Sequence, residues 1–195
     1  GRYAVAQGTI RIQSSDSEDP LTTRLIQRYR TIPNLEYGPE VHEVHSLNGA
    51  NMVICRTVFD QVGNFDERLG PGASGTSEDV ELALRILRTG MKIGYMREAI
   101  VYHQLDRSRL TEAYFKWIHK RQGQSRSLFK NPSMGRVLWN LSRATLQYGL
   151  YSLTRKERQK YRNKGRVYHY LGMLESRVKP GAECWHLKEP DGPAP

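Results

Sequence analysis

The sequence contains little cysteine: only Cys55 and Cys184 occur among its 195 residues. Two thiols cannot build the framework of a disulfide-rich secreted domain. Cys55 lies in an apolar run, so we interpret it as a buried thiol in a reducing compartment. The first residue is Gly1 rather than Met, and no secretory signal is recognisable, so we expect a fragment of a longer polypeptide.

Motifs that would assign a function directly are also missing. The glycine-rich stretch 69–77 (LGPGASGTS) lacks the glycine spacing and the Lys-Ser/Thr of a phosphate loop. His42 and His45 could hold a metal, but no cysteine or third ligand is close to them in the sequence. We find no internal repeat and no nucleic-acid-binding motif, and therefore expect no nucleic-acid partner.

Acidic residues are scarce in the second part of the chain. Residues 1–110 contain 13 Lys/Arg and 14 Asp/Glu, whereas residues 111–195 contain 17 and 6. The formal net charge of +10 therefore lies in the second part. A basic end of this kind favours an anionic partner, such as a membrane surface, nucleic acid or a phosphorylated ligand.

The pattern of residues 1–107 predicts an α/β arrangement. Residues 3–13 alternate as in an edge or half-exposed strand, and Asp19-Pro20 predicts a helix start with Asp as the N-cap. The densest apolar stretch is 47–103. In it we expect a turn at 48–51, a buried strand at 52–55, a flexible loop at 69–77, an amphipathic helix at 78–89 capped by Ser77, and short strands at 92–96 and 99–102.

Residues 108–178 predict a basic, aromatic-rich helical extension, and we expect the tail 179–195 to be disordered. The expected helices run from Ser108 to Gly123, from Met134 to Leu153, from Thr154 to about Lys164, and from Val167 to Val178.

The helix expected at 134–153 is apolar except for one stripe, which consists of Arg136, Asn140, Arg143 and Gln147. Its length suits a bilayer span, but Arg143 at its centre would cost roughly 3 kcal/mol or more. An interfacial helix on an anionic membrane fits better, and Trp117, Trp139, Tyr148 and Tyr151 suit the headgroup region. Ordinary packing against other helices is the alternative.

Glu78 and Asp79 open the predicted helix directly after the glycine-rich loop. Acidic residues in a first turn stabilise a helix by about 0.3–1 kcal/mol, which would explain the pair without any function. Alternatively, one carboxylate acts as a general base, with the loop covering a bound substrate. Two further features can likewise be interpreted as structural or as functional. His103 can be structural or a metal ligand, and Asn48-Gly49 can be an ordinary turn or a close approach to a ligand.

The run from Asn48 to His103 resembles the acceptor-side half of family 2 (GT-A type) glycosyltransferases. The shared elements are the NGAN turn, FDQVGNFDE, the Glu-Asp pair that opens a helix, GMKIGY and VYH, and they occur in the family's order. The resemblance implies Asp79 as the catalytic base and Glu78 as its neighbour that orients the loop or the acceptor. It also implies acceptor binding by Asn48, Gly49, Ala50, Asn51 and Ser77, and a metal or phosphate contact by His103.

The resemblance implies a second half of a GT-A (nucleotide-diphospho-sugar transferase, Rossmann-like) fold, followed by an α-helical region. The nucleotide-binding half of such enzymes ends in an Asp-x-Asp motif, and this chain contains none. We therefore expect a divalent metal, Mn or Mg, to be bound mainly by that absent half, and we expect the chain alone to be inactive.

The partners implied are a nucleotide-sugar donor, a glycan or lipid-linked acceptor of polysaccharide biosynthesis, and an anionic membrane surface. They predict a cytoplasmic protein held peripherally at the inner face of the cell membrane. The alternative is a non-catalytic, glycosyltransferase-like scaffold that lacks its donor-binding half.

Overall fold

The computed structural model describes residues 3–13 and 19–178. The chain has a mixed α/β fold, as expected, and it divides into two compact units. Among the described residues, unit 1 comprises 3–13, 32–67 and 77–105, and unit 2 comprises 19–31, 68–76 and 106–178. The units therefore interleave along the chain. The disorder expected for 179–195 lies outside the described residues.

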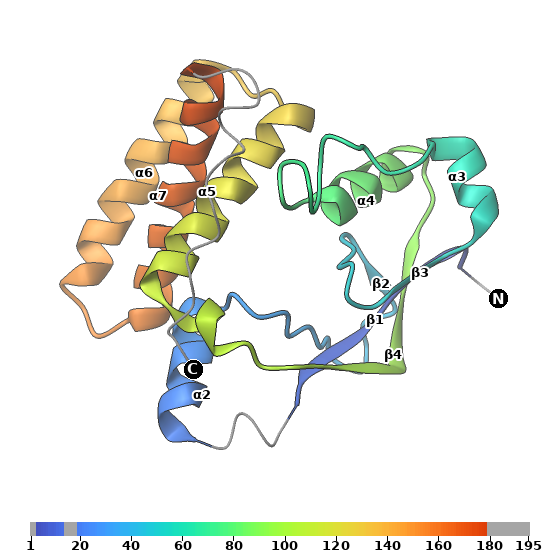
Figure 1. Ribbon diagram of the computed structural model, residues 1–195, viewed down its shortest axis with the longest axis horizontal. Helices are drawn as coiled ribbons and strands as arrows, with labels where there is room; N and C mark the ends of the chain where they lie inside the picture. The colour runs from blue at the N-terminus through green and yellow to red at the C-terminus, as the bar shows by residue number, and fades with distance from the viewer. Residues whose placement is uncertain (1–2, 14–18, 179–195) are drawn as a thin grey trace. The chain divides into compact units, whose positions relative to one another are not determined.

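Unit 1 is built on a mixed sheet with strand order β2-β4-β1-β3 (Figure 1). Its strands are β1 (Val5–Ile12), β2 (Glu43–Val44), β3 (Met52–Ile54) and β4 (Ile93–His103). β1 and β4 run parallel, whereas β3 is antiparallel to β1 and β2 is antiparallel to β4. The long parallel pair is therefore the centre of the sheet.

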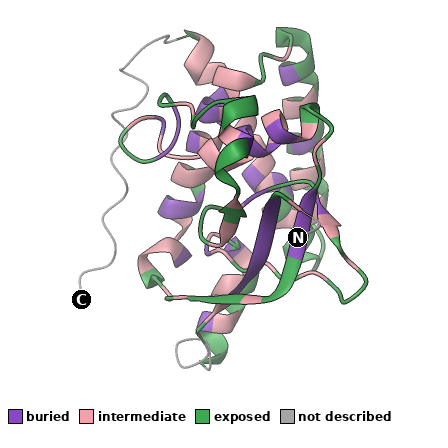
Figure 2. Cartoon of the chain, turned by 90° about the vertical axis from the view of Figure 1, so that its right-hand side faces the viewer, coloured by how far each residue is buried: buried purple, intermediate pink, exposed green. Residues whose placement is uncertain are grey.

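Two expectations about these strands are wrong. β1 was expected to be an edge or half-exposed strand, but it lies between two neighbours and its first six residues are buried, and Figure 2 shows how far each part of the chain is buried. Residues 52–55 were expected to be buried, but β3 is an edge strand and Val53 is 59% exposed. Short apolar runs do not reveal a strand's position in a sheet, because neighbours distant in sequence decide it. Cys55, which follows β3, is likewise exposed rather than buried.

The helices of unit 1 are α3 (Arg56–Val62) and α4 (Glu78–Arg88). α4 confirms the helix expected at 78–89, and its buried residues Leu82, Ala83 and Ile86 join the core of the unit. The expected pair Glu81–Arg85 forms, with Arg85 Nε 2.8 Å from Glu81 Oε1. Arg85 also donates to Asn64 O at 2.8 Å, which links α4 to the loop after α3.

Unit 2 contains α2 (Pro20–Tyr29), the 3-10 helix η1 (Arg107–Leu110), α5 (Glu112–Phe129), α6 (Met134–Ser152) and α7 (Glu157–Val178). The N-cap predicted at Asp19 is confirmed, since its carboxylate accepts from Thr22 N at 3.0 Å. The bounds expected for α6 are also confirmed within one residue.

Glycines lie within the helices of unit 2, although Gly123 was expected to end one. Gly123 is inside α5 and Gly165 is inside α7, so α7 is one helix instead of the two expected. A Cβ on Gly165 would lie 2.7 Å from His119 Nε2, and one on Gly172 would lie 2.9 Å from Lys120 C. These glycines let α5 and α7 approach closely, and this packing outweighs their weak helix propensity.

Gly123→Ala should destabilise unit 2 by about 1–3 kcal/mol, the usual cost of overpacking. The added methyl group would overlap the backbone of His169. The matched control is Gly149→Ala on α6, where a Cβ meets nothing within 4 Å and alanine should stabilise the helix by up to about 1 kcal/mol. Urea unfolding followed by circular dichroism measures both. Equal effects of the two substitutions would contradict this account of the packing.

Candidate functional site

Asp79 is joined to the turn that precedes β3. Its Oδ2 accepts a hydrogen bond from Gly49 N at 2.9 Å, and its Oδ1 accepts one from Val80 N at 2.7 Å. Residues from α4 and from the turn 48–51 are therefore brought together within unit 1. Asp79 is partly exposed, so its carboxylate can be reached from outside.

The turn 48–51 is held in shape by its own side chains and by β1. Ala50 N donates to Asn48 Oδ1 at 3.1 Å, and Asn51 N donates to Asn48 O at 3.1 Å. Asn48 N donates in turn to Gln7 Oε1 at 2.6 Å. Local bonds of this kind to an asparagine side chain are a common way to fix a turn.

Asn51 ties the turn to both central strands. Its Nδ2 donates to Thr9 O and to Ala99 O, each at 2.8 Å. Gln7, which is fully buried in β1, donates from Nε2 to Asn51 O at 2.8 Å. The position of Gly49 N, and with it the contact to Asp79, therefore depends on buried amide groups of the sheet.

The tie coincides with an irregularity in the parallel pair. Gly8 is opposite Met96 and Thr9 is opposite Ile100, so residues 97–99 of β4 have no partner on β1. Side-chain donors replace the missing strand partners of this segment. Thr9 Oγ1 donates to Arg97 O at 2.9 Å, and Asn51 Nδ2 donates to Ala99 O. A Cβ on Gly8 would lie 2.6 Å from Ala99 O, so glycine is required where the turn meets the sheet.

Glu78 differs from its neighbour in its surroundings. Its Oε2 is buried and accepts no hydrogen bond from the described residues. Burial, and secondarily the charge of Asp79, raise the pKa of the Glu78 carboxyl above its ordinary value. Glu78 therefore holds its proton to higher pH than a solvent-exposed glutamate does.

Ser77 occupies the N-cap position of α4, as expected, but its side chain does not cap the helix. Its backbone is left-handed, with φ of 78°, and its carbonyl accepts from Glu81 N at 2.9 Å. Left-handed backbone is uncommon for a residue with a side chain and marks a tightly constrained connection into α4. Its expected contact with a substrate stays a prediction.

The loop before Ser77 is held by hydrogen bonds within unit 2. Ser74 is fully buried, and its Oγ lies 2.8 Å from Ser125 Oγ of α5. Gly75 N donates to Gly70 O at 2.7 Å. The glycine-rich stretch therefore has a defined conformation around these anchors, and the covering motion expected from its composition stays a prediction.

His103 lies at the end of β4, away from the turn. It is four residues beyond Ala99, or about 13 Å along an extended strand. Its Nδ1 lies 2.7 Å from Gln104 O, and its backbone oxygen accepts from Gln13 N at 3.1 Å. Within residues 3–13 and 19–178, no three His, Cys, Asp or Glu side chains gather as a metal site. These residues therefore do not supply a donor set for a divalent cation.

The structure thus brings together five of the candidate residues: Asn48, Gly49, Ala50, Asn51 and Asp79. Glu78 and Ser77 adjoin Asp79 along the chain, whereas His103 lies at the end of β4. The supporting residues Gln7, Gly8 and Thr9 were not anticipated. The available signal was a glutamine and a glycine inside an otherwise apolar strand, VAQGTI, where each requires a specific reason.

Comparison with known proteins identifies no relative. No protein-family model matches the chain, and neither a curated protein nor a solved structure matches it.

Asn51→Asp should destabilise unit 1 by about 1–3 kcal/mol, because it replaces the donor between two carbonyl oxygens with an acceptor. Asn48→Asp is the matched control, since the Asn48 side chain accepts from Ala50 N and a carboxylate can do the same. Thermal and urea unfolding of both variants measure the difference. If Asn48→Asp is the more damaging change, the tie assigned to Asn51 is wrong.

Glu78→Gln should raise the free energy of unfolding above that of the unaltered chain, and this gain should be larger at neutral pH than at acidic pH. The pKa of Glu78 is raised from 4.5 in the folded state, so the folded protein binds this proton more tightly than the unfolded chain does. The free energy of unfolding therefore falls as the pH rises through and above 4.5, and glutamine removes this loss. Urea unfolding at about pH 4 and about pH 7 tests it. The prediction is wrong if the variant and the unaltered chain differ in free energy of unfolding by the same amount at both pH values.

Proposed function

We propose that this chain is the acceptor-side part of an inverting glycosyltransferase of the GT-A type, with Asp79 as the general base. The observation that carries the proposal is the hydrogen bond between Gly49 N and Asp79 Oδ2. It joins the turn and the helix start for which the resemblance implies acceptor binding and catalysis.

The carboxylate of Asp79 has the capacity for this role. Each carboxylate oxygen can accept about two hydrogen bonds, and each accepts one from a backbone amide within unit 1. A lone pair therefore remains for the hydroxyl of an acceptor. Because the two amides hold the carboxylate from the turn and from its own helix, it does not need to be ordered when the acceptor binds.

In the proposed reaction the acceptor hydroxyl donates its hydrogen bond to Asp79. Asp79 takes the proton as the acceptor oxygen forms a bond to the anomeric carbon, and the bond from that carbon to the nucleotide diphosphate breaks. Attack from the opposite side inverts the anomeric configuration. Glu78 is assigned the role of orienting the preceding loop or of forming a hydrogen bond with the acceptor.

The proposal places the nucleotide-sugar on a donor-binding half with an Asp-x-Asp motif, outside this chain. No step is assigned to a metal, because the described residues do not form a donor set. We further propose a glycan or lipid-linked acceptor and a site of action at the inner face of the cell membrane. Within the described part of the chain, no helix has the length and apolarity needed to cross a bilayer.

Asp79→Asn, made in the full-length polypeptide, should lower turnover by about 10²–10⁴-fold, the usual contribution of a general base. The asparagine oxygen can still accept from Gly49 N, but its amide nitrogen cannot accept from Val80 N, so the fold of the variant is checked by its unfolding curve. Asp60→Asn is the control, since it changes an exposed carboxylate of α3 and should leave turnover unaltered.

The measurement is release of the nucleotide diphosphate in the presence of acceptor, together with an unfolding curve for each variant. A folded Asp79→Asn variant with full activity would disprove the assignment of the base. Complete inactivity of the unaltered full-length polypeptide with every nucleotide-sugar tried would favour the scaffold alternative.

A further inference from the structure

One side of α6 exposes several large apolar side chains. We define the outer face of α6 as Leu138, Trp139, Leu146 and Leu150, together with Leu153 just after the helix. Trp139 is 69% exposed and Leu146 is 66% exposed. From Trp139 onward these residues follow at intervals of seven, four and three, so they project from one side of the helix. An apolar surface of this kind commonly marks an interaction site.

The outer face is not needed for packing inside unit 2. The buried residues of α6 are Val137 and Ala144, on the side of the helix opposite Trp139. α6 packs on α7, which supports it within the unit. The polar stripe of Arg136, Asn140, Arg143 and Gln147 lies between these two sides on one flank of the helix.

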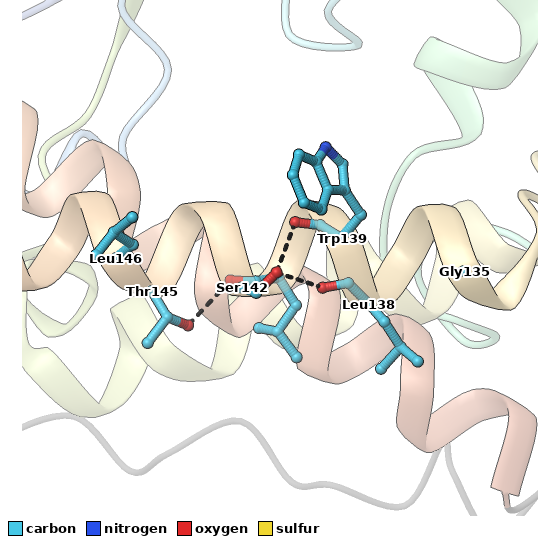
Figure 3. Close-up of a pocket in the computed structure, with 7 residues that line it drawn as sticks. Gly135, Leu138, Trp139, Ser142, Thr145 and Leu146 are labelled. Atoms are coloured by element: carbon cyan, nitrogen blue, oxygen red, sulfur yellow. Dashed lines mark hydrogen bonds between the residues drawn. The ribbon is translucent and has the colours of Figure 1, made fainter.

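The polar groups within the outer face are satisfied by the helix itself. Ser142 Oγ donates to Trp139 O at 3.0 Å and to Leu138 O at 3.1 Å, and Thr145 Oγ1 donates to Leu141 O at 3.0 Å (Figure 3). Leu138, Trp139 and Leu146 line a shallow hollow around these hydroxyls. Because neither hydroxyl depends on water for a partner, the face can enter an apolar environment at low cost.

The charges beside the outer face are all positive. The sequence contains no acidic residue between Glu112 and Glu157. Arg136 and Arg143 flank the face on the polar stripe, and Arg155 and Lys156 follow its end. None of these four side chains forms an ion pair with a described residue, and all four are exposed.

We propose that the outer face of α6 binds an anionic lipid surface, with its leucines and Trp139 in the headgroup region and with Arg136 and Arg143 on lipid phosphates. An amphipathic helix with an apolar face and basic flanks binds at such interfaces, and each nearby cation adds attraction to anionic headgroups. A second copy of the chain fits less well, because it would bring like charges together. This surface lies on α6 alone and does not depend on the proposed glycosyl transfer.

Flotation with vesicles of phosphatidylcholine alone, or of phosphatidylcholine and phosphatidylglycerol in equal parts, tests the proposal. The chain should float with the anionic vesicles only, and added salt should weaken this binding. The double variant Leu146→Ser, Leu150→Ser should bind at least about tenfold more weakly, since it removes two large apolar side chains from the face. Leu21→Ser is the control, because Leu21 is 64% exposed on α2 and should be dispensable.

Arg143→Gln tests the charge contribution and should weaken binding to anionic vesicles several-fold. Arg88→Gln removes an exposed arginine from α4 and should leave binding unaltered. The depth of the face is read from Trp139 as the sole tryptophan, in a Trp117→Phe, Trp185→Phe variant. Its emission should shift to the blue with anionic vesicles and be quenched by brominated lipid.

Several results would overturn the proposal. They are a failure to float with anionic vesicles, equal binding by the double-serine variant and the unaltered chain, and a Trp139 emission that brominated lipid does not change. A concentration-dependent dimer in the absence of lipid, abolished by Leu146→Ser, would assign the outer face to a second copy instead.

Discussion

The side-chain amide of Asn51 is the contact on which the candidate site depends. Backbone N–H groups of two paired strands are used by the pairing itself. A segment of β4 that lies out of register therefore has carbonyl oxygens that need other hydrogen-bond donors. Asn51 donates to one of them and to β1, and thereby fixes the turn whose Gly49 amide contacts Asp79. The irregularity in the sheet and the position of the Asp79 carboxylate therefore depend on the same side chain, Asn51.

The sequence allowed the local elements of this arrangement to be predicted, but not their connection. The turn at Asn48 and the helix at Glu78 follow from turn chemistry and from a 3.6-residue apolar period, both of which are local signals. The two short strands expected at 92–96 and 99–102 are one strand, β4, which lies out of register with β1 after Met96. What remained hidden was the partner of each polar side chain, because Gln7 and Asn51 are 44 residues apart and meet only in the folded sheet.

The glycines of unit 2 show the same limit of prediction from local sequence. Gly123 was interpreted as a helix end, since a glycine costs about 1 kcal/mol relative to alanine inside a helix, and two helices were expected on either side of Gly165. The structure keeps both inside helices, because the absent side chain allows α5 and α7 to touch. A close approach of this kind is a property of two segments together, so no single stretch of sequence carries its signature.

Helix α6 shows how one segment can serve folding and recognition at once. A helix that only filled a core would need one apolar side, but α6 has Val137 and Ala144 on one side and Trp139 and Leu146 on the other. The arginines lie between the two sides, where their charged ends reach water while their stems cover apolar surface. Because Ser142 and Thr145 donate back to their own helix, the outer side can leave water without losing hydrogen bonds. The same polar stripe that makes a transmembrane position costly thus suits a helix that lies flat on a charged surface.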